Sequence, residues 1–522
     1  MKIFLTTAID YVNSLPHIGT AYEKIGADVI ARFRRLCGDE VLFQMGNDEH
    51  SANVQKAAEA AGLPPKKYCD EMRPKFEAIW KKLHISYDRF IQTSDQNKHY
   101  PTVYEFFDRV NKAGDIYQKD YEGWYCESCE AFYTEKDLEN GLCKNHQKKP
   151  AWIKEKNYFF KLKKYEKALL NHIEANPGFI LPAKRKNEVA SFIKQGLEDF
   201  SISRSTFTWG IPVPLDKTHV FYVWFDALIN YLSWLGLKSL DDLKDNEYWK
   251  NVMHIVGKDI TRFHCIIWPA MLMSAGLPLP KTVFGHGFVY LRGEKMSKSL
   301  GNVVTPLDIL EKYPDFGADA LRYYLMRGSS FGDDGDFTWD GFIERYNADL
   351  ANGIGNLASR ILGMVWRYQG GSVSPRPFEE SQEDLIFKAN EVWEYLKIDL
   401  SIDEKDPTDI RPHRALEAIW RFISAIDQYI DRRAPWQLAK DKKVDDLSQI
   451  LTLLVECVRR LSIFCGIFVP DASKKIWRAY GFDKWKNFSD IRAPDQFDSP
   501  LSKMPHKLTE LKLNLFPRIQ VI

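Results

Sequence analysis

A His-x-Gly stretch opens a segment that the sequence predicts to be a helix. In "LPHIGT", residues 15–20, His17 and Gly19 follow an apolar, strand-like run over residues 2–8. The unpaired N–H groups at a helix N-terminus favour an anion, an imidazole can hydrogen-bond phosphate oxygens, and glycine lets a ligand approach the backbone closely. The stretch indicates a nucleotide site, although a histidine at a helix start can equally be structural.

Two lysines mark a second stretch whose residues could take part in a reaction, "RGEKMSKSLGN" over residues 292–302. Lys295 and Lys298 alternate with serines between two glycines, which predicts a basic loop. Cations that close on a polyphosphate stabilise the charge that develops as a phosphorus–oxygen bond breaks. A solvated surface loop is the plain alternative for such a segment taken alone.

Cysteine spacing predicts a metal site in the middle of the chain. "CESC" at 126–129 and "CKNH" at 143–146 are two ligand pairs separated by thirteen residues. This spacing suits one tetrahedral zinc ion with the ligands Cys126, Cys129, Cys143 and His146. All four positions are filled by protein side chains, so we expect a structural Zn²⁺ rather than a catalytic one.

Strands and helices alternate around the first two stretches. Residues 1–50 read as strand, helix and strand, which is the pattern of a parallel βαβ unit. Ligands of such sheets bind beyond the carboxyl ends of the strands, where both His17 and Asp48 are expected. A second α/β stretch covers 218–305, whereas helical periodicity dominates around 383–398, 414–433 and 446–466.

The predicted fold class is α/β: a split Rossmann-type parallel-sheet catalytic domain with a zinc-bearing insertion, followed by an all-α bundle. The expected divisions are a first catalytic half (1–116), a connective insertion with the zinc knuckle (117–217), and a second catalytic half ending in the lysine loop (218–305). A linker or stem-contact region (306–355) and a helical domain with the C-terminal tail (356–522) follow.

Composition describes a globular protein with little overall charge. The chain has 522 residues, 45% hydrophobic residues, a formal net charge of +1 and 8 cysteines. Any nucleic-acid surface must therefore be local. Asp10 interrupts the N-terminal apolar run, so we expect no signal peptide, and no apolar run reaches the length of a membrane span. These features predict a cytoplasmic protein without a membrane partner.

Taken together, the blocks resemble those of class I aminoacyl-tRNA synthetases. "HIGT" resembles the first signature of that class, usually His-Ile-Gly-His, and "KMSKS" resembles the second. "AIDYVNSLPHIG", "FYVWFDALINY", "GKDITRFHCIIWPAML", "GEKMSKSLGNVV" and "DALRYYLMR" are similar to blocks of the methionyl-tRNA synthetase family, and this similarity covers essentially the whole chain. Two positions depart from the pattern: Thr20 replaces the second histidine, and Leu228 stands where proline is often found.

The resemblance implies two sets of binding residues. The methionine pocket would comprise Ile9, Tyr11, Asp48, Trp224, Ala227, Leu228, Tyr231, Ile260 and His264. The ATP site would comprise His17, Gly19, Thr20, Gly257, Asp259, His286, Gly287, Lys295 and Lys298. Among these, His17, Lys295 and Lys298 would carry the catalysis. A carboxylate suits the ammonium group of an amino acid, and aromatic rings suit a thioether. Asp259 can alternatively cap the helix that follows it.

The resemblance also implies that the helical domain reads an anticodon. "GNLASR" and "RRAPWQLAK" imply contacts from Asn356, Arg360 and Trp436, although Trp436 can equally pack at a helix start. Unstacked bases need an aromatic face and donors for their edges.

The implied function is a methionine–tRNA ligase, with Mg²⁺-ATP, L-methionine and tRNA(Met) as partners and a monomer as the expected state. Three alternatives stay open: a sister ligase for another apolar amino acid, a small-molecule nucleotidyltransferase, and a non-catalytic or altered-specificity paralogue.

Overall fold

The computed structural model describes residues 1–126, 131–133, 135, 138–144, 148–205, 208–296, 302–375, 383–401, 409–492 and 500–520. Three predicted site residues, Cys129, His146 and Lys298, lie outside the described residues, as does the side chain of Lys295. Among the described residues, none of the helices combines the length and the apolar character needed to cross a bilayer.

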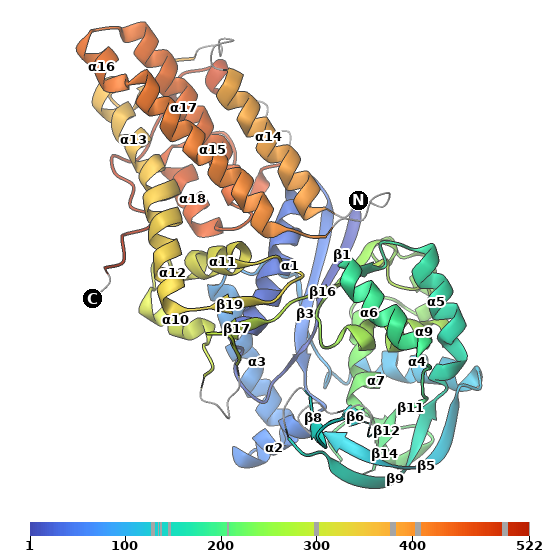
Figure 1. The fold of residues 1–522 in the computed structure, drawn as a ribbon. Helices are drawn as coiled ribbons and strands as arrows, with labels where there is room; N and C mark the ends of the chain where they lie inside the picture. Colours follow the sequence, from blue (N-terminus) through green and yellow to red (C-terminus); the bar gives the residue numbers. More distant parts are fainter. Residues whose placement is uncertain are drawn as a thin grey trace.

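A seven-stranded parallel sheet forms the centre of the molecule (Figure 1). Its order is β10 (Ile180–Leu181), β16 (Thr282–His286), β15 (Val252–Gly257), β1 (Lys2–Thr7) and β3 (Glu40–Asp48), and β3 also pairs with β2 (Asp10–Tyr11) and β4 (Arg89–Gln92). The first half of the chain supplies β1 and β3, and the second half supplies β15 and β16. The predicted mixed α/β class with a central parallel sheet is confirmed.

Both faces of the sheet are buried. In β1, Ile3 and Leu5 join one apolar cluster, whereas Phe4 between them joins a second cluster on the opposite face. Because successive strand side chains point to opposite faces, a strand buried on both sides must be apolar throughout, as "KIFL" is.

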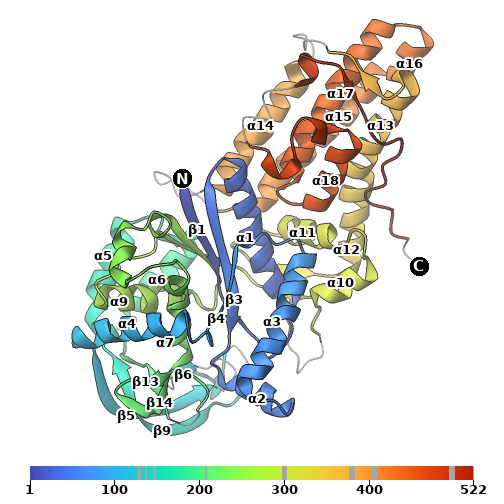
Figure 2. The same ribbon diagram turned by 180° about the vertical axis from the view of Figure 1, so that it is seen from behind.

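Helices cover each face of the sheet. The first cluster receives α1 (Ile18–Leu36) and α3 (Pro65–Lys82). The second receives α4 (His99–Lys112) and α9 (Trp268–Ser274). Figure 2 shows α3 beside β4 and α1 behind β3. The remaining helices of residues 1–350 are α2 (Ala52–Ala60), α5 (Glu166–Ala175), α6 (Ala183–Lys194), α7 (Val223–Leu228), α8 (Asn230–Ser233), α10 (Pro306–Lys312), α11 (Gly317–Gly328) and α12 (Trp339–Arg345).

The expected insertion, 117–217, contributes to more than one sheet. A four-stranded sheet contains β11 (Phe200–Ser201), β9 (Ala151–Phe160), β5 (Ile116–Cys126) and β6 (Ala131–Tyr133). A second small sheet contains β12 (Ser203–Arg204), β14 (Asp216–Phe221) and β13 (Pro212–Val213). In addition, β10 of this segment forms the edge strand of the main sheet. Two residues of the expected insertion are thus part of the central sheet.

The C-terminal third is helical. It contains α13 (Asn356–Gln369), α14 (Glu383–Leu400), α15 (Pro412–Arg433), α16 (Pro435–Lys440), α17 (Val444–Cys465) and α18 (Pro470–Ala479). The three segments predicted from periodicity correspond to α14, α15 and α17. These helices project from one side of the main sheet, and the β5–β9 sheet lies at the other end of the molecule (Figure 1).

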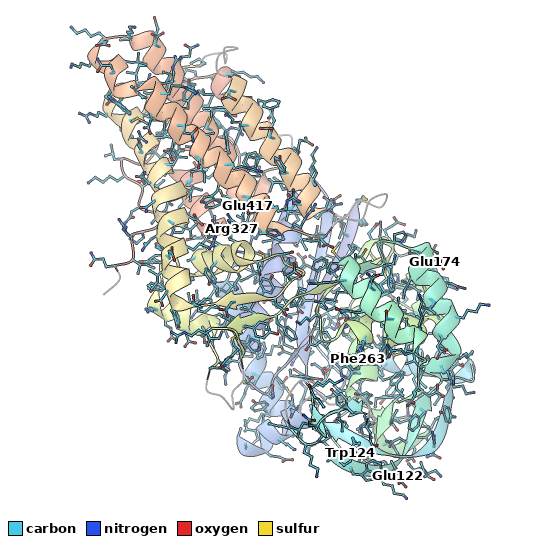
Figure 3. All side chains as sticks on the ribbon, in the orientation of Figure 1. Glu122, Trp124, Glu174, Phe263, Arg327 and Glu417 are labelled. Atoms are coloured by element: carbon cyan, nitrogen blue, oxygen red, sulfur yellow. The ribbon has the colours of Figure 1, made fainter. Side chains whose placement is uncertain are left out.

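Helix α11 joins the central sheet region to the helical region. Arg322, fully buried on α11, pairs with Asp28 of α1 at 2.7 Å. Its guanidinium also donates to the carbonyl oxygens of Leu83, Ile467 and Phe468, the last two from the α17–α18 turn. Arg327, near the C-terminal end of α11, pairs with Glu417 of α15 at 3.0 Å (Figure 3).

The joint at Arg322 predicts a large stability effect. Arg322→Ala leaves Arg32 as the remaining arginine partner of the buried Asp28 and removes the donor to three carbonyl oxygens, which together should lower the free energy of unfolding by about 3–5 kcal/mol. Urea denaturation followed by circular dichroism measures this change. Lys66→Ala, which removes an exposed i,i+4 pair with Asp70, is the control and should change stability by less than about 1 kcal/mol. Equal effects of the two variants would contradict the role given to Arg322.

Candidate active site

His17 caps the helix that faces the end of β1. Its Nδ1 accepts from the backbone N–H of Gly19 at 3.0 Å and of Thr20 at 3.3 Å. Because Nδ1 acts as an acceptor, the ring proton resides on Nε2, and this N–H is the donor that the ring can offer to a phosphate oxygen. A Cβ on Gly19 would lie 2.8 Å from His17 Cε1, so the glycine is needed for this close approach. Capping and ligand binding are therefore compatible roles for His17.

The lysine loop begins next to this helix. Strands β17 (Val289–Leu291) and β18 (Glu294–Lys295) form a hairpin whose two turn residues, Arg292 and Gly293, both have positive φ. The side chain of Met296 then lies 3.6 Å from the Cβ position of Gly19. After the loop, Val304 O accepts from the N–H of Ile18 at 3.0 Å. Residues that precede and residues that follow Lys298 in the chain thus both contact the first signature stretch.

The carboxyl end of β15 supplies Gly257 and Asp259. A Cβ at Gly257 would lie 2.6 Å from Asp259 Oδ1 and 3.9 Å from His286 Nε2. The sequence prediction that these three residues share one site is consistent with this geometry. The strand β1 lies beside β15, and ligands of doubly wound sheets bind at such a crevice between oppositely wound halves.

His286 is held by protein partners on both ring nitrogens. Nε2 lies 3.0 Å from Glu23 Oε2, and Nδ1 lies 2.7 Å from Gly287 O. Glu23 also pairs with the buried Lys24, and although burial raises the pKa of Glu23, Lys24 and His286 lower it below its usual value. His286 is therefore positioned rigidly at the end of β16.

The backbone amide of Gly287, which the resemblance implies for the ATP site, is bonded within the protein. Its backbone N–H donates to Phe331 O at 3.0 Å, so this amide is already used within the protein rather than available to an adenine. A Cβ at Gly287 would lie 2.0 Å from Asp333 O. The glycine therefore permits the 331–334 segment to approach β16.

Tyr11 and Asp48 lie opposite each other in the main sheet. They are register partners in the parallel pairing of β2 with β3, and Asp48 is the last residue of β3. Only 5% of Asp48 is exposed. Ile9 immediately precedes β2 and is half-buried. The structure thus brings together the carboxylate and the first aromatic ring of the predicted amino-acid pocket.

Aromatic rings from two further segments form the remaining wall. Trp224 of α7 stacks on Phe263 with 3.8 Å between ring centroids, and its ring is edge-on to His264 at 6.3 Å. Tyr231 Oη lies 2.7 Å from His264 Nε2. Ala227 and Leu228 are buried on the same short helix as Trp224. Figure 3 labels Phe263 in the part of the molecule around α7.

The imidazole of His264 has a defined tautomer. Nδ1 lies 3.0 Å from Ile260 O, which can only accept, so Nδ1 carries the proton and Nε2 accepts from Tyr231. Burial lowers the pKa of His264 to about 4, so the ring is neutral at pH 7. A π-helical turn, Phe263–Ile267, holds this part of the chain, and such turns are frequent at functional sites.

The two described cysteines of the predicted zinc site are buried at strand ends. Cys126 ends β5, and Cys143 ends β8 (Leu142–Cys143). The β7 (Leu138–Glu139) to β8 hairpin turns through Asn140 and Gly141, both with positive φ, which is a favoured turn for a tight hairpin. Buried thiols at these strand ends fit the donor chemistry of a structural zinc ion.

Two of the three predicted anticodon residues lie together on the helical region. The Arg360 guanidinium lies 5.7 Å from the Trp436 ring centroid and pairs with Asp431 at 2.7 Å. Trp436 is 45% exposed, so it is not a packing residue of the helix start. Asn356, the first residue of α13, is exposed one turn before Arg360.

Sequence reasoning missed three residues of this region. Phe263 stacks on Trp224, Glu23 holds His286, and Met296 reaches Gly19. Phe263 directly precedes His264, a residue implied for the methionine pocket, and this adjacency was a usable signal. Glu23 gave none, because its partner lies far along the chain.

The close approach at Gly257 predicts an effect on ATP binding. In Gly257→Ala, the new methyl group must displace the Asp259 carboxylate, and ATP affinity measured by calorimetric titration should fall about tenfold. Gly363→Ala is the control, because a Cβ there meets no atom within 4 Å. An unchanged ATP affinity in Gly257→Ala would remove Asp259 from the nucleotide site.

The buried His264 predicts a pH dependence of stability. Below about pH 6.5 the unfolded chain takes up a proton at this histidine, whereas the folded chain does so only near pH 4. The free energy of unfolding should therefore fall by about 3 kcal/mol through this residue as pH drops across that window. Between pH 7 and pH 5, which covers the upper part of this window, His264→Gln should lose about 2 kcal/mol of that decrease in urea titrations. Burial first, and His264 second, lower the pKa of His254, so His254 contributes to the slope in both proteins and somewhat less in His264→Gln.

Comparison with known proteins identifies the family of the whole chain. The family described as tRNA synthetases class I (M) matches residues 3–143 and 134–362. The methionine–tRNA ligase of Fusobacterium nucleatum is 43% identical, with 100% of this chain and 80% of that protein aligned. That of Thermotoga maritima is 41% identical, with 93% and 76% aligned.

A solved structure is similar over its whole length. Mycobacterium tuberculosis methionyl-tRNA synthetase in complex with methionyl-adenylate superposes with a TM-score of 0.89 at 39% identity, covering 99% of this chain and 100% of that one. The family resemblance drawn from the sequence motifs is thereby confirmed, and the chain belongs to the methionyl-tRNA synthetase family of class I tRNA synthetases.

Proposed function

We propose that this protein is a methionine–tRNA ligase, which activates methionine with ATP and transfers it to tRNA(Met). One observation carries the proposal: Met296 and Val304, which precede and follow Lys298 in the chain, both contact the first residues of α1 that His17 caps. Similar proteins named methionine–tRNA ligase, and the similar structure that holds methionyl-adenylate, support it.

In the first step, the methionine carboxylate attacks the α-phosphorus of Mg²⁺-ATP, the bond to the bridging oxygen breaks, and pyrophosphate leaves. No side chain acts as a nucleophile, so positioning and charge stabilisation supply the rate. The N–H on His17 Nε2 would donate to a phosphate oxygen, and Lys295 and Lys298 would neutralise the developing charge. Mg²⁺ would supply further positive charge on the phosphates.

In the second step, a ribose hydroxyl of the terminal adenosine of tRNA attacks the methionyl carbonyl and AMP leaves. Arg360 and Trp436 would contact anticodon bases, with an indole face for stacking and a guanidinium for base edges. His264 Nε2 accepts the Tyr231 proton, so this hydroxyl would have no proton to donate to the thioether sulfur, and Tyr231 would contact the thioether through its ring.

A structural Zn²⁺ held by Cys126, Cys129, Cys143 and His146 is part of the proposal. It would stabilise the segment at the end of β5 without a direct part in the reaction, since the set offers no open coordination position. The domain limits, a monomeric state and a cytoplasmic location stay predictions.

Exchange of labelled pyrophosphate into ATP tests the proposed activity. The full chain is assayed with a panel of amino acids, and methionine should support exchange at least about a hundredfold better than leucine, valine or isoleucine, because several pocket contacts discriminate. Exchange with another amino acid would identify a sister ligase. Absence of exchange with every amino acid would identify a non-catalytic paralogue and contradict the proposal.

A lysine variant separates chemistry from amino-acid binding. Lys298→Ala should reduce the exchange rate at saturating methionine about a hundredfold or more and leave methionine affinity, measured by calorimetry, within about threefold. A parallel fall of both quantities would contradict the role assigned to Lys298.

A further inference from the structure

A buried cluster of one carboxylate and two imidazoles comes from segments that also carry residues proposed to bind methionine. Asp226 Oδ2 lies 2.6 Å from His50 Nδ1, and Asp226 Oδ1 lies 2.5 Å from His99 Nε2. The three side chains are between 0% and 1% exposed. They come from α7, from the segment after β3 and from the start of α4, and none belongs to the proposed contact residues.

Hydroxyl groups complete the cluster. His50 Nε2 lies 3.3 Å from the Tyr100 hydroxyl, and His99 Nδ1 lies 2.7 Å from Ser233 Oγ of α8. A carboxylate only accepts, so each imidazole donates its facing N–H to Asp226. Burial on its own would raise the pKa of Asp226, but the two histidines lower it to about 2, so the carboxylate is ionised at pH 7.

The segment that contains His50 is also held from its other side. The Trp209 indole N–H donates to Glu49 O at 2.5 Å, and its ring is edge-on to His50 with 5.1 Å between centroids. The Glu49 carboxylate accepts from Gln92 Nε2 at 2.8 Å and from the Ser94 hydroxyl. The chain after β3 is therefore fixed by hydrogen bonds at two consecutive residues.

Sequence position connects the cluster to the two walls of the pocket. Asp48, the proposed partner of the methionine ammonium group, lies two residues before His50. Trp224 lies two residues before Asp226, on the same short helix. The Asp226–His50 bond thus links the segment that presents the carboxylate to the helix that presents the aromatic wall.

We propose that Asp226 is a positioning residue that fixes Asp48 relative to Trp224 through its hydrogen bonds to His50 and His99, and so sets the affinity for the amino acid. This inference rests on the proposed function. Taking ions out of water is costly, and an apolar trio of similar volume would hold the fold as well or better. Hydrogen bonds add a defined orientation, and a displacement of about 1 Å in an active site can cost about a hundredfold in rate.

Asp226→Ala in the full chain tests the inference by pyrophosphate exchange. The KM for methionine should rise about tenfold to a hundredfold, while the KM for ATP stays within about threefold. Asp226→Asn keeps the shape and one acceptor, so it should rescue most of the loss, with a methionine KM between those of the parent and Asp226→Ala. If Asp226→Ala does not fold, the same divergence of the two KM values, at a smaller size, is expected in Asp226→Asn.

Asp115→Ala is the matched control. Asp115 is an equally buried carboxylate bonded to Lys164 at 2.6 Å, Ser274 at 2.8 Å and the Tyr165 hydroxyl, away from the proposed pocket. It should lower the thermal midpoint without separating the two KM values. Equal rises of both KM values in the Asp226 variants, or no rise in either, would overturn the inference.

A further variant separates this inference from the proposed function. If the parent chain exchanges pyrophosphate with methionine and Asp48→Ala raises the methionine KM, the proposed function stands whatever Asp226 does. An Asp48→Ala protein with an unchanged methionine KM would instead contradict the assigned pocket, and the role of Asp226 with it.

Discussion

The parallel pairing of β1 with β15 is the constraint on which the site depends. The register sets Thr7 beside Ile255, so both strands end at the same edge of the sheet although the insertion separates them in the chain. His17 follows one strand end and Gly257 closes the other. His17, Gly19, Gly257 and Asp259 therefore follow adjacent strand ends, which is the place where doubly wound sheets bind ligands.

Local chemistry made much of this arrangement predictable. The apolar run of β1, the periodicity of α1 and the turn-forming glycines indicated a parallel sheet with a ligand edge, and the helical periods around α14, α15 and α17 indicated a bundle. Tyr11 and Asp48 were predicted from a family resemblance. Their pairing in the β2–β3 register explains physically why two residues so far apart in the chain lie together. By contrast, β10 was not separable from the insertion, since two residues carry no periodic signal.

What the sequence could not reveal is pairing over long chain separations. The Asp28–Arg322 and Glu23–His286 contacts join residues far apart in the chain, and each partner alone reads as a charged helix or strand residue. Gly287 shows the same limit in another form: its N–H donates to Phe331 O, and nothing in the residues around Gly287 indicates this distant acceptor. Burial of polar groups depends on tertiary context, which composition and spacing do not contain.

The replacement of the second signature histidine by Thr20 illustrates which atoms the N-terminus of α1 needs. It is the backbone N–H of residue 20, together with that of Gly19, that His17 Nδ1 accepts. This bond orients the His17 ring and places its proton on Nε2 whatever side chain residue 20 carries. Loss of an imidazole at that position therefore leaves the capped geometry of α1 intact.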